Sequence, residues 1–179
     1  MSLKHAILGF LSISAKTGYD LQKKNEQTIQ HFWPSTQSQI YRTLKELERG
    51  GLIDGEVTIQ HEKPNKRMYT LTPKGKKELL GWVASPLEPA PHRNQFLVQL
   101  FFSEHISRDA ICANLSHYRE RLKARLEYMK SKEVQDKIAF AVSPKEKALF
   151  EIIVDNGVRL LETEMDWADS SIAKMKELE

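Results

Sequence analysis

Cysteine is almost absent from this sequence of 179 residues, which contains Cys112 and no other cysteine. A disulfide framework and a zinc site built from cysteines are therefore excluded. Long apolar runs are also missing, since no stretch approaches the roughly 18 residues that span a membrane. The apolar stretch at residues 6–11 is too short for a signal peptide and lacks its flanking residues. We therefore expect a cytoplasmic protein with no membrane partner.

The motifs of common enzyme classes are missing as well. The sequence contains no G-x-G-x-x-G, no G-K-[ST] loop, no G-x-S-x-G and no H-E-x-x-H. Acidic residues are numerous, but none is marked by its context as part of a catalytic pair. The histidines are scattered and form no His-x3-His pair, which disfavours a metal site. We expect no enzymatic activity, no cofactor and no metal.

Charge is divided unevenly along the chain, although the net charge is only +3. Residues 1–80 contain 13 Lys and Arg against eight Asp and Glu, whereas residues 81–179 contain 14 against 16. This division favours contact between the first half and a polyanion. Hydrophobic residues make up 40% of the chain, so it can bury a folded core and disorder is not expected.

Apolar residues at helical spacing predict three helices near the start of the chain. They cover residues 3–13, 17–32 and 35–50, the last with Ser35 as its N-cap. Gly9 lies inside the first of these helices, where glycine costs about 1 kcal/mol relative to alanine. A close approach by a neighbouring backbone would explain that glycine.

A hairpin and a fourth helix follow. Residues 52–60 and 68–71 have the composition of strands and are separated by a turn-rich, basic tip. Pro73 then opens a helix at its first position. Three helices, a hairpin and a helix form the order of a winged helix-turn-helix. We therefore predict a mainly α fold with a small β-hairpin, in which residues 1–84 are a DNA-binding domain.

The third predicted helix carries the strongest functional signal. Ile40, Leu44 and Leu47 share one face at 100° per residue and predict the side that meets the core. The opposite face is rich in hydroxyls and cations, which suit the base edges and phosphates of a DNA major groove. The residues predicted to contact DNA, here and in the flanking segments, are Tyr19, Ser35, Thr36, Gln37, Ser38, Gln39, Tyr41, Arg42, Lys45, Arg49, Lys63, Lys66 and Arg67. The alternatives are a solvated helix face and, for the hairpin, cations that only protect a sheet edge.

The second half is predicted to be helical and to hold two copies of the chain together. Residues 85–92 are rich in proline and predict a linker, and residues 93–179 form the helical dimerisation domain, which may also receive an effector. Apolar residues after position 108 follow the spacing of a coiled-coil seam. The predicted dimerisation residues are Leu115, Tyr118, Leu122, Leu126, Ile153, Leu160 and Trp167. The alternative is that these helices cover only their own domain, and Asn156 either sets dimer register, touches a ligand or is simply exposed.

Residues 3–82 contain a series of short motifs, which read A-I-L-G-F-L from Ala6, G-Y-D-L from Gly18, S-Q-I-Y from Ser38, G-L-I from Gly51 and Y-T-L-T-P-K-G from Tyr69. In this order they resemble the motifs of the PadR family of bacterial transcriptional regulators. The helical second half resembles the family subgroup with the longer C-terminal domain. Members of the short subgroup commonly have Tyr-Pro where this chain has Tyr41-Arg42, which adds a cation to the predicted DNA face.

The resemblance implies a homodimer that represses transcription by binding an inverted repeat in double-stranded DNA, a palindromic operator. It also implies release by a small aromatic effector such as a phenolic acid, which is a flat anion. An aromatic cavity with one or two donors would suit such a ligand. The effector-binding candidates are Phe32, Trp33, Trp82, His92, Arg93 and Phe96, with Phe101 and Phe102 nearby. The alternative for these aromatic residues is an ordinary core role.

A second function class remains open for the same fold. A winged helix can serve as an architectural or protein-binding module that uses its hairpin to hold a partner. Such a module predicts weak, sequence-independent DNA binding or none, whereas a repressor predicts tight binding to one palindrome.

Overall fold

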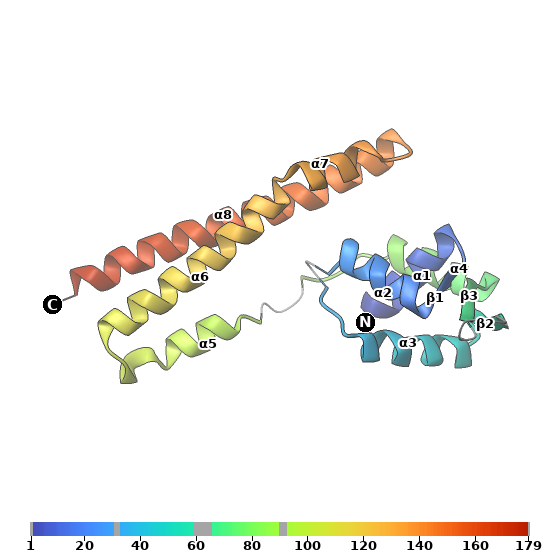
Figure 1. Ribbon diagram of the computed structural model, residues 1–179, viewed down its shortest axis with the longest axis horizontal. Helices are drawn as coiled ribbons and strands as arrows, with labels where there is room; N and C mark the ends of the chain where they lie inside the picture. The colour runs from blue at the N-terminus through green and yellow to red at the C-terminus, as the bar shows by residue number, and fades with distance from the viewer. Residues whose placement is uncertain (1, 31–32, 59–65, 90–92, 179) are drawn as a thin grey trace. The chain divides into compact units, whose positions relative to one another are not determined.

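The computed structural model describes residues 2–30, 33–58, 66–89 and 93–178. The chain divides into two compact units, Met1–Pro89 and Ala90–Glu179, whose arrangement relative to one another is not determined (Figure 1). This boundary lies inside the segment predicted to be a linker. Each unit is therefore described by itself.

The N-terminal unit contains the predicted winged helix-turn-helix (Figure 1). Its elements are α1 (Ser2–Ile13), β1 (Lys16–Thr17), α2 (Gly18–Gln27), α3 (Gln37–Arg49), β2 (Ile53–Thr58), β3 (Lys66–Leu71) and α4 (Pro73–Ala84). The strands form one antiparallel sheet in the order β1-β3-β2. The prediction of a mainly helical fold with a small β-structure is confirmed.

The core of this unit is formed where the apolar faces of α1, α2 and α3 meet the sheet. The predicted inner face of α3 is confirmed, because Ile40, Leu44 and Leu47 are all buried. The cluster also contains Ile7, Leu8, Leu11, Leu21, Ile53 and Tyr69. Burial of one α3 face leaves the opposite face to solvent.

The start of α3 differs from the prediction by one residue. Thr36, not Ser35, is the N-cap: its hydroxyl accepts from the Gln39 amide, and the Gln39 side chain accepts from the Thr36 amide. This reciprocal capping box needs a carboxylate or carboxamide three residues after the cap, which Thr36 has in Gln39 and Ser35 lacks. Ser35 instead accepts a hydrogen bond from Asn25 Nδ2 at 2.9 Å.

One further boundary and one strand of this unit differ from the prediction. The second helix was expected to reach residue 32, but α2 ends at Gln27. The sheet has a third strand, β1, which pairs Lys16 with Tyr69 and Thr17 with Met68. A strand of two residues is too short to show the period-two pattern by which strands are recognised.

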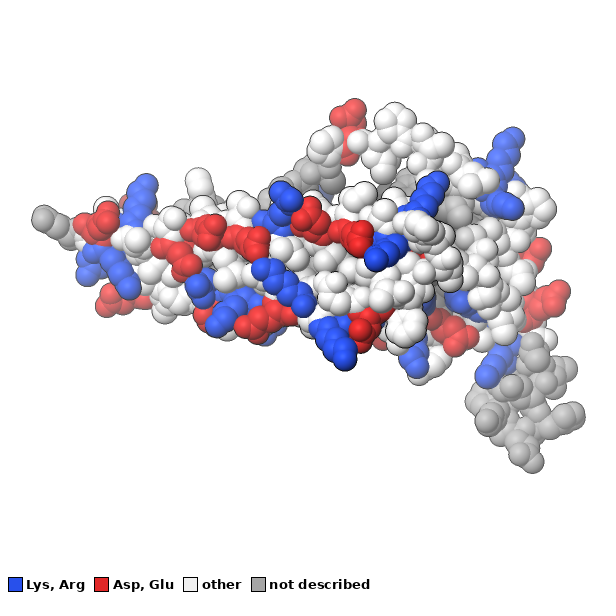
Figure 2. Space-filling model, turned by 90° about the horizontal axis from the view of Figure 1, so that it is seen from above, with Lys and Arg blue, Asp and Glu red and all other residues white. Residues whose placement is uncertain are grey.

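The C-terminal unit is entirely helical in the residues described. It comprises α5 (Gln95–Phe101), a 3-10 turn η1 (Ser103–His105), α6 (Arg108–Met129), α7 (Lys132–Ala139) and α8 (Pro144–Glu177). The two long helices, α6 and α8, lie along each other (Figure 1). Ser143 caps α8 and Pro144 occupies its first position. Acidic and basic side chains are interspersed over the surface of this unit seen in Figure 2.

Candidate nucleic-acid interface

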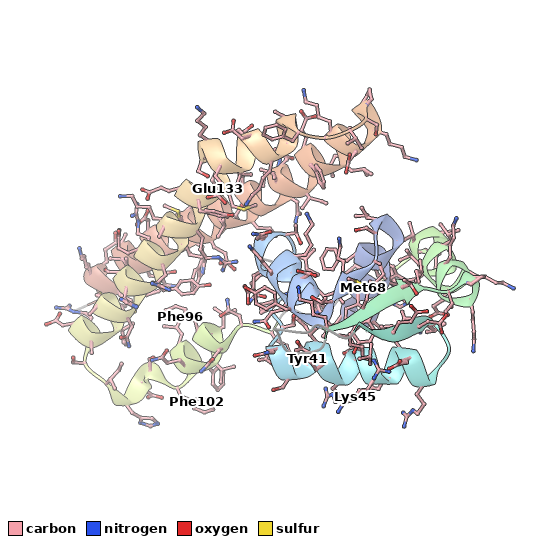
Figure 3. All side chains as sticks on the ribbon, turned by 45° about the vertical axis from the view of Figure 1, so that its right-hand side comes forward. Tyr41, Lys45, Met68, Phe96, Phe102 and Glu133 are labelled. Carbon is pink, nitrogen blue, oxygen red and sulfur yellow. The ribbon has the colours of Figure 1, made fainter. Side chains whose placement is uncertain are left out.

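The outer face of α3 is exposed and positively charged. Tyr41 and Lys45 project from it in Figure 3, and Arg42 and Arg49 are exposed on the same helix. Within the described part of the chain, no acidic side chain forms an ion pair with Arg42, Lys45 or Arg49. Gln37 and Ser38 are exposed in the first turn. This face can therefore present cations and hydrogen-bonding groups to a polyanion.

Several of the predicted contact residues already have bonds within the unit. Gln39 Oε1 accepts from the Thr36 amide at 2.8 Å, so contact with a base would use the Gln39 amide nitrogen. Ser35 is held by Asn25, which also donates to Gln30 Oε1 at 2.9 Å. These bonds fix the segment that leads into α3.

The N-terminus of α2 lies against α3. A Cβ atom added at Gly18 would be 2.7 Å from Cε1 of Tyr41, so the tyrosine ring packs on this glycine. Tyr19, the next residue, is exposed. Hydrogen bonds from the Thr17 hydroxyl and amide hold the pKa of the Asp20 carboxyl below its usual range and keep it charged at the helix start.

The hairpin cations have different surroundings. Lys66 is exposed at the start of β3, while Lys63 lies outside the described residues. Arg67 was predicted to contact phosphate, but its guanidinium donates to Glu48 of α3 and lies 5.9 Å from the centre of the Tyr69 ring. It is therefore an ion-paired side chain rather than an unpaired cation. The pairing was missed because the two residues are 19 positions apart and no local pattern connects them.

The effector-binding candidates are distributed over both units. Trp82 stacks on His5 within the N-terminal unit, with ring centroids 4.4 Å apart. Glu78 accepts from Lys4 at 2.5 Å beside this pair, and its pKa is lowered chiefly by that bond. Trp33 is exposed, and Phe32 and His92 lie outside the described residues.

An aromatic cluster in the C-terminal unit was only partly predicted. Phe96 stacks on Tyr118 with centroids 4.2 Å apart, and Trp167 meets both rings edge-on at 6.3 and 6.4 Å. Tyr118 donates to Glu164 Oε2 at 3.0 Å, and burial is the main cause of its raised pKa. A shallow depression beside the cluster is also lined by Arg93, which is exposed. Sequence spacing could not reveal the cluster, since its three rings come from α5, α6 and α8.

The predicted dimerisation residues fall into two groups. Leu115 and Leu122 are 1% and 2% exposed within a single chain, so they already serve the packing of this unit. Leu126 is half-buried on the same helix, as is Tyr118. By contrast, Ile153 and Leu160 of α8 are exposed. Together with Leu149 and Asn156 they follow a 4-3-4 spacing, which is the heptad pattern of a helix that packs against a partner helix.

Two kinds of site are not found among the described residues. No three His, Cys, Asp or Glu side chains there are grouped closely enough to hold a metal ion. Nor does any described helix combine the length and the apolar character that crossing a membrane requires.

Two family descriptions match consecutive parts of the chain. Residues 7–80 match the Transcriptional regulator PadR-like family, and residues 92–176 match Virulence activator alpha C-term. Over 89 residues, 50% of this chain and 47% of the relative, the sequence is 39% identical to Probable transcriptional regulator Rv1176c of Mycobacterium tuberculosis. Over 108 residues, 59% of each chain, it is 39% identical to Negative transcriptional regulator PadR of Bacillus subtilis. The chain thus aligns with about half the length of these relatives.

Solved structures extend the similarity over almost the whole chain. Bacillus subtilis PadR in complex with operator DNA matches with a TM-score of 0.81 and 28% identity, over 98% of this chain and 99% of that chain. The same protein in complex with p-coumaric acid matches with a TM-score of 0.76 and 25% identity, over 99% and 100% of the two chains. The winged helix-turn-helix, its ordered motifs and these matches agree: residues 7–80 form a domain that matches the Transcriptional regulator PadR-like family, and the fold of the chain is similar to that of Bacillus subtilis PadR.

Proposed function

We propose that the protein is a homodimeric repressor that binds an inverted repeat in double-stranded DNA through α3. The observation that carries this proposal is the exposed face of α3, where Arg42, Lys45 and Arg49 have no ion-pair partner among the described residues. Gln37 and Ser38 lie at the N-terminal end of the same helix, where recognition helices contact base edges. The similarity to Bacillus subtilis PadR, solved with operator DNA, supports this reading.

Dimerisation is part of the proposal because one winged helix contacts only a few base pairs. Two copies of α3 held roughly 34–36 Å apart would reach successive major grooves on one side of the duplex. The exposed heptad stripe on α8 (Leu149, Ile153, Asn156 and Leu160) supplies an apolar surface for the second copy. Asn156 within this stripe would specify helix register, since its amide requires a partner when buried.

The experiment that tests DNA recognition is selection of random duplexes by the purified protein at two salt concentrations. We expect enrichment of an inverted repeat whose half-sites lie about one helical turn apart. A steep salt dependence shared by all sequences, without an enriched motif, would indicate backbone contact alone. That outcome would reject the repressor and favour an architectural or protein-binding winged helix.

Replacing Leu160 with aspartate is expected to shift the protein from dimer to monomer. Leu160 is 59% exposed in a single chain, so the substitution disturbs no buried packing but places a charge in the proposed interface. Leu80→Asp is the matched control, because Leu80 of α4 is 58% exposed and lies outside the α8 stripe. Sedimentation velocity measures the outcome. Equal dimer content in the two variants would contradict a dimer built on this stripe.

We also propose that a small aromatic carboxylate releases the protein from DNA. The cluster of Phe96, Tyr118 and Trp167, with Arg93 exposed beside it, offers ring stacking and a cation to a flat anion. Bacillus subtilis PadR has been solved with p-coumaric acid, which is such a molecule. The effector must bind the DNA-free state more tightly than the DNA-bound state, because otherwise it shifts no population. Operator affinity measured across a panel of phenolic acids tests this, and a constant affinity would reject it.

A further inference from the structure

Glu48 and Arg67 join the last turns of α3 to the hairpin. Glu48 lies one residue before the end of α3, and its Oε1 accepts a hydrogen bond from Nη2 of Arg67 in β3. The bond raises the pKa of Arg67 further above its usual value, so the guanidinium stays charged. It connects the helix proposed to enter the groove with the strand that leads back from the hairpin tip.

The neighbouring strand β2 has a glycine at the position closest to this ion pair. Gly55 of β2 faces Tyr69 in the sheet register. A Cβ atom at Gly55 would lie 2.6 Å from Oε1 of Glu48, 2.7 Å from Nε of Arg67 and 3.0 Å from Cε1 of Tyr69. A larger residue at position 55 would have to displace the Glu48 and Arg67 side chains, as is common where a strand is closely approached. The pair therefore lies against Gly55 of the sheet, although its side chains remain partly exposed, 47% for Arg67 and 30% for Glu48.

The face of α3 that carries Glu48 makes a second contact about two turns earlier, at Tyr41. Tyr41 and Glu48 are seven residues apart, which places them on one face two turns from each other. Tyr41 packs on Gly18, while Glu48 binds Arg67. Tyr69, which is buried and whose pKa is raised chiefly by that burial, lies beneath Arg67.

We propose that Glu48 is a positioning residue for DNA binding: through Arg67 it fixes the β2–β3 hairpin relative to α3. This inference rests on the proposed function of α3 and adds a requirement for an acidic residue on a surface that faces a polyanion. Lys66 directly precedes Arg67 in β3. The Glu48–Arg67 ion pair, called the brace below, would therefore set where Lys66 meets phosphate while the exposed cations of α3 contact the groove.

The proposal predicts a change in DNA affinity opposite to the change that charge alone would produce. Removing an acidic group near DNA strengthens binding if charge alone matters, because the group repels phosphate. If Glu48 acts as a brace, Glu48→Gln weakens binding to the selected operator by about fivefold, the upper range for a partly exposed ion pair. Glu46→Gln is the matched control, since Glu46 is an exposed acid on α3 with no ion pair among the described residues. We expect this control to bind as tightly as the parent protein or more tightly.

Fluorescence anisotropy with the operator duplex, measured over a range of salt, supplies the affinities. Glu48→Gln binding as tightly as Glu46→Gln would overturn the proposal. Arg67→Gln gives a second test that separates positioning from direct contact. Loss of a phosphate contact lowers the slope of log affinity against log salt by about one, whereas loss of a brace lowers affinity with the slope unchanged. A lowered slope would return Arg67 to the role of a phosphate contact and also overturn the proposal.

Amide hydrogen exchange without DNA tests the brace independently of DNA binding. We expect faster exchange in the β2–β3 amides of Glu48→Gln than in those of Glu46→Gln, and recovery in the exchanged pair Glu48→Arg with Arg67→Glu. Equal exchange in both single variants would contradict the brace. If the parent protein selects no DNA sequence, the proposed function fails, and this measurement still decides whether Glu48 holds the hairpin.

Discussion

Replacing Gly75 with alanine is expected to lower the free energy of unfolding of the N-terminal unit by about 3 kcal/mol, the upper range for overpacking. Gly75 is buried in the first turn of α4, where an added Cβ would overlap the carbonyl oxygen of Leu52 and lie 2.8 Å from Cδ1 of Leu71. The Leu52 carbonyl also accepts from the Thr72 amide at 3.2 Å. The Leu52 carbonyl cannot move away without weakening its hydrogen bond to the Thr72 amide, and the backbone at Gly75 cannot move without disturbing the first turn of α4.

Gly81→Ala provides the matched control in the same helix. No heavy atom of the described residues lies within 4 Å of a Cβ at Gly81. The substitution should therefore stabilise α4 by up to about 1 kcal/mol through helix propensity alone. Urea unfolding of both variants, followed by circular dichroism, measures the difference. Equal changes in the two variants would show that Gly75 is not in close contact with Leu52.

Reversing the charge of Arg42 and Lys45 together is expected to abolish binding to the selected operator. Each side chain is exposed on α3 without an ion pair among the described residues, and each lost DNA contact costs about 1–3 kcal/mol. The Arg42→Glu, Lys45→Glu variant should therefore bind at least 100-fold more weakly, since repulsion adds to the lost contacts. Anisotropy at fixed salt measures this loss.

The control for net charge is Lys76→Glu with Lys77→Glu on α4, which changes the total charge by the same amount. Both of these lysines are exposed and lie outside the predicted DNA contacts. If this control loses as much affinity as the α3 variant, the effect is one of overall charge and α3 is not the recognition helix. Unchanged activity of the α3 variant toward a protein partner would favour the architectural alternative.

Periodicity and caps predicted most of the N-terminal fold because they report neighbours within one or two turns. The spacing of Ile40, Leu44 and Leu47 identified the buried face of α3, and the outer face followed as its complement. Pro73 at the first position of a helix identified the start of α4 in the same way. The exposed cations of the α3 face follow from the same spacing, which requires no tertiary contact.

Glycine shows where such local reasoning stops. Gly9 in α1 was expected to admit a neighbouring backbone, yet no described atom lies within 4 Å of a Cβ placed there. The close approach occurs instead at Gly75, against Leu52, and at Gly55, against Glu48 and Arg67. The sequence shows that a position has no Cβ, but not whether a Cβ there would clash. That depends on a neighbouring residue from a distant part of the chain.

The sequence by itself determined the order of elements, the buried and exposed faces of α3, and the resemblance of residues 3–82 to the PadR family, because each depends on residues close together along the chain. Only the tertiary structure decided that Arg67 pairs with Glu48, that Leu115 and Leu122 are buried in their own chain, and that Phe96 stacks on Tyr118. These contacts join residues far apart in sequence, and their partners are chosen by packing and charge once the helices and the sheet have come together.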